Sequence, residues 1–284
     1  MRSVDFREED FPDGLSATNS GLSADAELTA DEIARLQTRF GAYTDAGGRG
    51  DLVAPDPHWR SERGSAIAAG YKQTYKGGRL FDLRGQLKRL MANRCPSCGG
   101  ARPGELDHHL PKTAYREFAV LPANLVACCG ACNRTKGAGV GGTAEEALLH
   151  PYFDRLPETP FIQVAVDVGE RYVRAALAFD EGAAIGDDLL KARMLNHFAR
   201  VDVNLQLESE VEELIGETSA GFYNANPPPS AETVATALHS AADAKASYFG
   251  QGCWQAAVLR ALAQSEAYCA GGYSATRRTV VAGA

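Results

Sequence analysis

Two Cys-x-x-Cys pairs enclose an Asp-His-His sequence near the middle of this 284-residue chain. The first pair is Cys95 and Cys98, and the second pair is Cys129 and Cys132. A structural zinc ion takes four thiolate or imidazole ligands in a tetrahedron, and each Cys-x-x-Cys turn supplies two of them. The spacing therefore predicts a structural Zn²⁺ site, and the alternative is a pair of redox-active or incidental dithiols. The remaining cysteines are expected to be buried free thiols, namely Cys128, Cys253 and Cys269.

Side chains suited to phosphodiester hydrolysis lie between the cysteine pairs and just after them: Asp107, His108, Asn124 and Asn133. This hydrolysis needs a base that activates water and a cation that stabilises the charge developing on the phosphate. Histidine has a pKa near neutrality and suits the first role. A hard divalent ion prefers oxygen ligands. Our hypothesis is that His108 is the general base and that Asp107 and Asn133 hold one Mg²⁺ or Mn²⁺.

The order of these residues within the cysteine framework resembles the HNH endonucleases, the zinc-stapled branch of the ββα-metal (His-Me finger) nucleases. The resemblance covers residues 95–137, and the third signature position, His in many members, is Asn133 here. It implies an α+β fold in which a β-hairpin carries His108 and a helix after the second cysteine pair packs on the hairpin. It also implies that Asn124 bonds across the hairpin, and that DNA is cut to leave a 5′-phosphate and a 3′-hydroxyl.

Basic residues near these positions are candidates for nucleic-acid binding. Arg134 and Lys136 follow the last cysteine and either contact phosphate or are solvated charges at the start of a helix. Lys112 and Arg116, in the loop after His108, could grip the DNA backbone. The second histidine of the pair, His109, is expected to pack on the opposite face of a strand, and His150 to cap and pack.

The charge of the chain is uneven, although its formal net value is −7. Residues 1–58 carry a net charge of −7, residues 59–83 of +3, residues 84–136 of +6 and residues 137–284 of −9. The basic part coincides with the cysteine-histidine part, which favours DNA as a partner. The alternative is that the charges cluster by chance.

Helical and strand patterns surround the cysteine framework. Residues 1–30 are expected to form an acidic, extended or disordered arm, and a helix then begins near Thr29 or Asp31. Further helices are expected over about 64–75 and 80–92, the latter with Arg84, Lys88 and Arg89 on its polar face. After the framework we expect a short helix ending at Pro151, a hairpin of strands 161–168 and 172–179, and four helices, of which the first covers about 186–199 with Leu195 facing inward.

These patterns predict three parts. Residues 1–58 form the acidic N-terminal arm and helix, residues 59–155 the HNH nuclease domain with its leading basic helices, and residues 156–284 a C-terminal α/β accessory domain with a hairpin and helices. No run of 18 apolar residues occurs and the first residues lack the apolar core of a secretory signal, so we expect a cytoplasmic protein with no membrane span.

Two functions are compatible with the sequence. The first is a metal-dependent DNA endonuclease, whose acidic flanks could dock a basic protein partner such as an ATPase in an anti-phage or restriction system. The second is a zinc-stapled module that binds nucleic acid or protein without turnover. Asp107 and Asn133 favour the endonuclease, because a zinc ribbon that only binds has no need of them.

Overall fold

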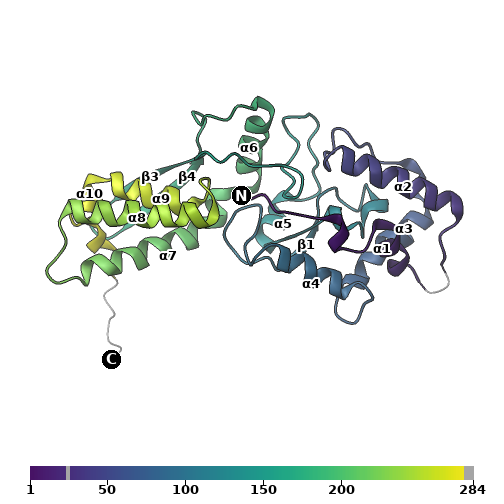
Figure 1. Cartoon of the computed structure of the whole chain (residues 1–284), viewed down its shortest axis with the longest axis horizontal. Helices are drawn as coiled ribbons and strands as arrows, with labels where there is room; N and C mark the ends of the chain where they lie inside the picture. Colours follow the sequence, from purple (N-terminus) through teal and green to yellow (C-terminus); the bar gives the residue numbers. More distant parts are fainter. Residues whose placement is uncertain (24–25, 278–284) are drawn as a thin grey trace. The chain divides into compact units, whose positions relative to one another are not determined.

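The computed structural model describes residues 1–23 and 26–277 and divides into two compact units (Figure 1). The first unit comprises Met1–Leu156 and Asp187–Val201, and the second comprises Pro157–Gly186 and the chain from Asp202 onward. Each unit combines helices with one two-stranded antiparallel sheet, which agrees with the predicted α+β class. Among the described helices, none has the length and apolar character needed to cross a membrane.

The centre of the first unit is a strand pair followed by a helix. β1 (Glu105–His108) pairs antiparallel with β2 (Leu125–Cys128), and His108 lies opposite Leu125. Helix α5 (Gly130–Lys136) begins two residues after β2 and packs against β1. The helix ends at Gly137, whose φ of 61° is in the left-handed region that glycine adopts without steric cost.

A basic amphipathic helix supports this strand pair from below in the view of Figure 1. Helix α4 (Phe81–Leu90) buries Leu83 and Leu87, which pack in one apolar cluster with Leu106 of β1 and Leu125 of β2. The helix therefore lies within the range predicted from the apolar spacing of residues 80–92. Its end leads directly to Cys95, so its packing also places the first cysteine pair.

The N-terminal residues are part of the first unit. The N–H of Val4 donates to the carbonyl of Pro151 at 2.8 Å, and the Phe6 ring stacks on Tyr152 with centroids 4.4 Å apart. For the described residues, the prediction of an extended or disordered arm over 1–30 is wrong, because this segment has apolar side chains that the unit buries. The helices here are η1 (Glu8–Asp10), α1 (Gly14–Gly21), α2 (Ala30–Asp45), η2 (Pro57–Arg60), α3 (Glu62–Ala69) and η3 (Gly70–Thr74).

Residues 144–156 form two turns, at 144–146 and 151–153, and no helix, so the prediction of a short helix ending at Pro151 is wrong. The backbone N–H of His150 donates to the Asp154 carboxylate at 2.6 Å, which fixes a turn instead. Arg193 of α6 (Asp188–Val201) donates to both carboxylate oxygens of Asp154, at 2.6 and 2.7 Å. Helix α6 is therefore part of the first unit. Leu195 is 41% exposed and does not face inward as predicted, because the buried face of α6 carries Arg193, Met194, His197 and Phe198.

The second unit contains the predicted hairpin, β3 (Ile162–Val168) and β4 (Val173–Phe179), which the structure confirms. Helix α9 (Trp254–Gln264) packs on β3, α7 (Val203–Tyr223) packs on β4, and α8 (Ala231–Phe249) packs on α9. The second unit also contains α10 (Glu266–Cys269) and η6 (Gly272–Thr276).

Two short 3-10 helices of the first unit lie between β1 and β2, namely η4 (Arg116–Phe118) and η5 (Pro122–Asn124).

Candidate metal centre and active site

The four framework cysteines converge in the first unit. The Sγ atoms of Cys95, Cys98, Cys129 and Cys132 all lie within 4.8 Å of one another, and all four residues are buried. Zn–S bonds of about 2.3 Å in a tetrahedron place the sulfur atoms about 3.8 Å apart, so a small displacement would close this cluster around zinc. Four buried sulfurs with no other role form a donor set that fits a structural Zn²⁺ ion.

Local backbone geometry builds each half of the cluster. In the first pair, Gly99 has a φ of 77° and its N–H donates to the Cys95 carbonyl at 2.8 Å, which closes the turn. In the second pair, Cys129 caps α5, and its Sγ accepts a hydrogen bond from the N–H of Cys132 at 3.4 Å. Backbone N–H groups directed at sulfur favour the thiolate form that a metal requires.

Cys128, Cys253 and Cys269 are buried, as predicted, and none of the three forms a disulfide. Cys128 adjoins the second pair on β2 and stays outside the four-sulfur cluster. Burial raises the pKa of the Cys128 thiol, so this side chain remains protonated and apolar in character.

His108, at the end of β1, has one ring nitrogen fixed by the backbone. Its Nε2 lies 2.9 Å from the carbonyl oxygen of Ala119, which can only accept, so Nε2 carries the proton. The lone pair is then on Nδ1. Burial lowers the pKa of His108 to about 3, so the imidazole is neutral at pH 7. The ring can therefore accept a proton at one defined atom.

Asn124 fixes the loop that follows His108. Its Nδ2 donates to the carbonyls of Leu110 at 3.0 Å and Phe118 at 3.1 Å, and its Oδ1 accepts from the Leu110 N–H at 2.8 Å. The side chain is fully buried. One amide thus spans both ends of the loop whose Ala119 carbonyl holds His108.

A second network supports Asn124 from behind. The Tyr43 hydroxyl lies 3.1 Å from Oδ1 of Asn124 and 2.9 Å from Nε2 of His150. His150 Nδ1 accepts from the Tyr152 N–H at 3.2 Å, so Nε2 of His150 donates to Tyr43 and Tyr43 donates onward to Asn124. The His109 ring lies 4.1 Å from that of His150, which gives both histidines packing roles.

Asp107 forms an ion pair with Lys136 of α5. The Nζ atom of Lys136 lies 2.9 Å from the Asp107 carboxylate and also donates to the His108 carbonyl at 2.8 Å. The two side chains are 13% and 10% exposed. Burial raises the pKa of Asp107, and the Lys136 ammonium opposes that rise. Lys136 therefore neutralises the carboxylate that was predicted to hold the divalent ion.

Glu105 is a site residue that the sequence reasoning missed. Its carboxylate accepts a hydrogen bond from Nδ2 of Asn133 at 2.6 Å. Because the amide nitrogen is engaged, the oxygen of Asn133 is the atom left for a cation. Glu105 stands two residues before Asp107 on β1, so strand alternation would have placed both carboxylates on the same face.

The predicted nucleic-acid contacts differ in their surroundings. Arg134 is exposed on α5, whereas Lys136 is held by Asp107. Arg116 donates to the Ser61 carbonyl at 3.1 Å and to Ser65 Oγ at 2.9 Å, so it ties its loop to the start of α3. Lys112 lies over the ring of Tyr71, with Nζ 4.3 Å from the ring centroid.

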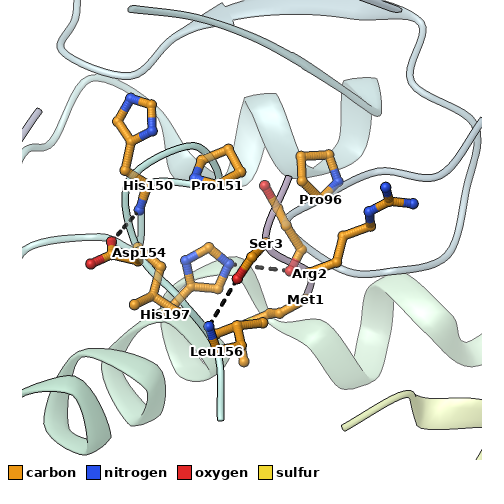
Figure 2. Close-up of a pocket in the computed structure, with 11 residues that line it drawn as sticks. Met1, Arg2, Ser3, Pro96, His150, Pro151, Asp154, Leu156 and His197 are labelled. Atoms are coloured by element: carbon orange, nitrogen blue, oxygen red, sulfur yellow. Dashed lines mark hydrogen bonds between the residues drawn. The ribbon is translucent and has the colours of Figure 1, made fainter. Parts of the chain in front are cut away.

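A pocket beside the first cysteine pair is separate from these groups. Figure 2 shows the N-terminal segment lying across it: Ser3 Oγ accepts from the Leu156 N–H at 2.8 Å, and Arg2 donates its N–H to the Pro96 carbonyl at 3.0 Å. His197 Nε2 lies 3.2 Å from the Ser97 carbonyl. The described residues that line it do not include Asp107, His108 or Asn133. Pro96 and Ser97, which lie between the first two cysteines, line this pocket.

Comparison with known proteins gives one partial likeness. A segment of 64 residues is 39% identical to protein ea31 of Escherichia phage lambda. That segment is 22% of this chain, and the chain covers only 22% of ea31. No protein-family model and no solved structure matches the chain.

Proposed function

We propose that this chain is a metal-dependent DNA endonuclease of the HNH type, with His108 as general base. The observation that carries the proposal is the neutral His108 ring, held through Nε2 by the Ala119 carbonyl with its Nδ1 lone pair available. A hydrogen bond that fixes one ring nitrogen sets the tautomer and leaves the other nitrogen to take a proton from water. A bound phosphate would raise the low pKa of the ring towards neutrality by its negative charge.

Asp107 and Asn133 are the residues that would hold Mg²⁺ or Mn²⁺. Their oxygens suit a hard cation, and Glu105 orients the Asn133 amide by accepting from its nitrogen. The bound ion would supply positive charge against the charge developing on the phosphate. Lys136 must leave the Asp107 carboxylate for this to occur, and its ammonium is then free to contact a phosphate oxygen.

The substrate must reach both faces of β1. The contacts of Asp107 are with α5, whereas His108 packs on Tyr71 of η3, so the two side chains lie on opposite faces of the strand. We therefore place the phosphodiester at the end of β1, where it would contact both side chains. The zinc cluster, in this proposal, fixes α5 relative to β2 and takes no part in the reaction.

Cleavage of a supercoiled plasmid tests the proposal. The wild type should nick or linearise it with Mg²⁺ or Mn²⁺, and His108→Ala should lower the rate at least about 100-fold because the base is lost. His239→Ala, at an exposed histidine of α8, is the matched control and should cut normally. Equal cutting by wild type and His108→Ala would rule out His108 as the base. DNA affinity without turnover would favour a zinc-stapled binding module.

A protein partner would account for the acidic flanks. Residues 1–58 and 137–284 carry net charges of −7 and −9 and would repel DNA while attracting a basic surface. We extend the proposal to a nuclease effector held by a partner such as an ATPase of an anti-phage or restriction system. Rapid cutting by the isolated chain would contradict this extension and leave the nuclease assignment intact.

A further inference from the structure

A series of aromatic rings in contact with one another, with cations beside them, leads from His108 to the protein surface. The His108 ring is tilted against Tyr71 with centroids 4.5 Å apart, and the Tyr71 hydroxyl donates to the Leu106 carbonyl at 2.7 Å. Lys112 lies over the Tyr71 ring. Tyr71 is buried, so its ring is a fixed contact for the His108 ring on the way to the surface.

Tyr75 continues this series and is open to solvent. Its ring meets Tyr71 edge to face, with centroids 5.7 Å apart, and 51% of the residue is exposed. The guanidinium of Arg84, from α4, lies 4.8 Å from the centre of the Tyr75 ring. We call Tyr71, Tyr75, Arg84 and Lys112 the tyrosine platform.

The cations of the platform lack acidic partners. Within residues 1–23 and 26–277, no carboxylate lies within 4.0 Å of the charged nitrogens of Arg84 and Lys112, and the same holds for Lys72 and Lys88, which lie outside the platform as defined. In the same part of the chain, Nη1 of Arg84 is buried without a hydrogen-bond partner. Burial and then the positive charge of Lys72 lower the pKa of Lys112. Such an arrangement favours a polyanion.

We propose that the tyrosine platform binds a single-stranded stretch of DNA, with an unstacked base against Tyr75 and phosphates at Arg84 and Lys112. This inference rests on the proposed nuclease function, for which it names the form of the substrate. An exposed ring between cations is the arrangement by which proteins bind single strands, because stacking needs a base face that a duplex keeps covered. In this arrangement Tyr75 would hold the base at the surface, and the buried Tyr71 ring would connect Tyr75 with the His108 ring.

The test is equilibrium binding by the full-length chain in the His108→Ala background, without added Mg²⁺ or Mn²⁺. Fluorescence anisotropy compares a labelled 12-nucleotide single strand with a 12-base-pair duplex at fixed salt. Tyr75→Ala should weaken single-strand binding about tenfold and duplex binding less than twofold, whereas Tyr75→Phe should keep the affinity. Tyr172→Ala is the matched control, because Tyr172 is also exposed and lies under an arginine, Arg174, in the second unit; it should bind as its parent does.

A second variant tests the phosphate contact and leaves the Tyr75 ring in place. Arg84→Gln should weaken single-strand binding. It should also make the negative slope of log K, the binding constant, against log salt concentration shallower by about one, as expected for one lost phosphate contact. Unchanged single-strand affinity in Tyr75→Ala, or equal loss for single strand and duplex, would overturn the proposal. Tighter binding of the RNA strand of the same sequence would overturn its assignment to DNA. Because binding is measured without cleavage, a chain that fails to cut DNA still gives a decisive result here.

Discussion

At the scale of single residues, the candidate site depends on side chains that each hold several backbone groups. Asn124 connects both ends of the loop after His108, and Tyr43 connects Asn124 to His150. These groups are buried, so each hydrogen bond replaces one that water would have supplied. The position of the His108 ring is therefore decided by residues that take no part in the proposed chemistry.

Replacement of Asn124 tests this support. Asn124→Ala leaves the N–H and the carbonyl of Leu110 without partners and removes one of the two hydrogen bonds that the Phe118 carbonyl accepts. We expect the free energy of unfolding to fall by about 3 kcal/mol. Urea denaturation followed by Trp59 emission in a Trp254→Phe background measures this loss in the first unit. The control is Asn224→Ala, at an exposed asparagine, which should change stability by less than about 0.5 kcal/mol. Similar losses for the two would contradict the supporting role.

The ion pair between Asp107 and Lys136 gives a second test. Lys136→Met leaves a buried carboxylate without its cation and should lower the free energy of unfolding by about 3 kcal/mol. Asp107→Asn in the same chain removes the stranded charge, so the double variant should recover part of the loss. Denaturant unfolding of the wild type, both single variants and the double variant gives a double-mutant cycle. We expect a coupling free energy of about 1–3 kcal/mol between the two side chains. Strictly additive losses would mean that the pair does not contribute.

At the scale of elements, the four sulfurs link the segment after α4 to the junction between β2 and α5. The first pair follows α4, and the second joins β2 to α5, whose seven residues are too few to form a stable helix alone. Asn133 and Lys136 both lie on α5, so the metal would fix the separation between β1 and the helix that faces it.

Loss of one cysteine ligand should therefore release α5. Cys98→Ala should abolish bound zinc and lower the melting temperature of the first unit by more than about 10 °C, because a structural zinc site contributes directly to folding. Elemental analysis and thermal unfolding measure both effects. Cys128→Ala removes a buried thiol next to the second pair and is the control. It should keep about one zinc per chain, and loss of zinc in that variant would mean that the ligand set is wrong.

At the scale of the whole molecule, the two units carry different sets of histidines. The first unit buries His108, His109, His150 and His197, whereas His239 of the second unit is exposed. Burial lowers the pKa of His150 to about 3 and that of His197 to about 4. Each unit also contains one tryptophan, Trp59 in the first and Trp254 in the second, so the stability of each can be followed separately.

Acid should destabilise the first unit selectively. The folded-state pKa of His150 lies below the value of about 6.5 in an unfolded chain, so the unfolded state binds a proton that the folded state excludes. The contribution of a buried neutral histidine to the free energy of unfolding is fully present above pH 6.5 and is lost as the pH drops towards 3. The loss is about 1 kcal/mol per buried histidine between pH 6.5 and 5.5.

Urea unfolding at these two pH values, with zinc present, checks this pH dependence. Trp59 emission should report a loss of about 4 kcal/mol for the four buried histidines. Trp254 emission should report much less, since His239 is exposed. His150→Gln should make the free energy of unfolding of the first unit depend less steeply on pH. An equal pH dependence for the two units would contradict the assignment of the effect to the buried histidines.

The sequence by itself determined the features that depend on short separations along the chain. The spacing within each cysteine pair encodes a tight turn, the apolar spacing of residues 80–92 indicated a helix, and the alternation in residues 161–179 indicated a hairpin. It also indicated that the four cysteines belong to one cluster, because each Cys-x-x-Cys turn supplies only half of a tetrahedral site.

Only the tertiary structure decided which distant groups meet. Lys136, for which the sequence left open a phosphate contact or a solvated charge, forms an ion pair with Asp107, 29 positions earlier. The Glu105 carboxylate accepts a hydrogen bond from the side-chain amide of Asn133. Residues 1–23 and helix α6 belong to the first unit because Val4, Phe6 and Arg193 find partners far away in sequence. A charged or apolar side chain contacts whichever matching group the fold brings close to it. The periodicity of a sequence indicates local helices and strands and does not indicate these distant partners.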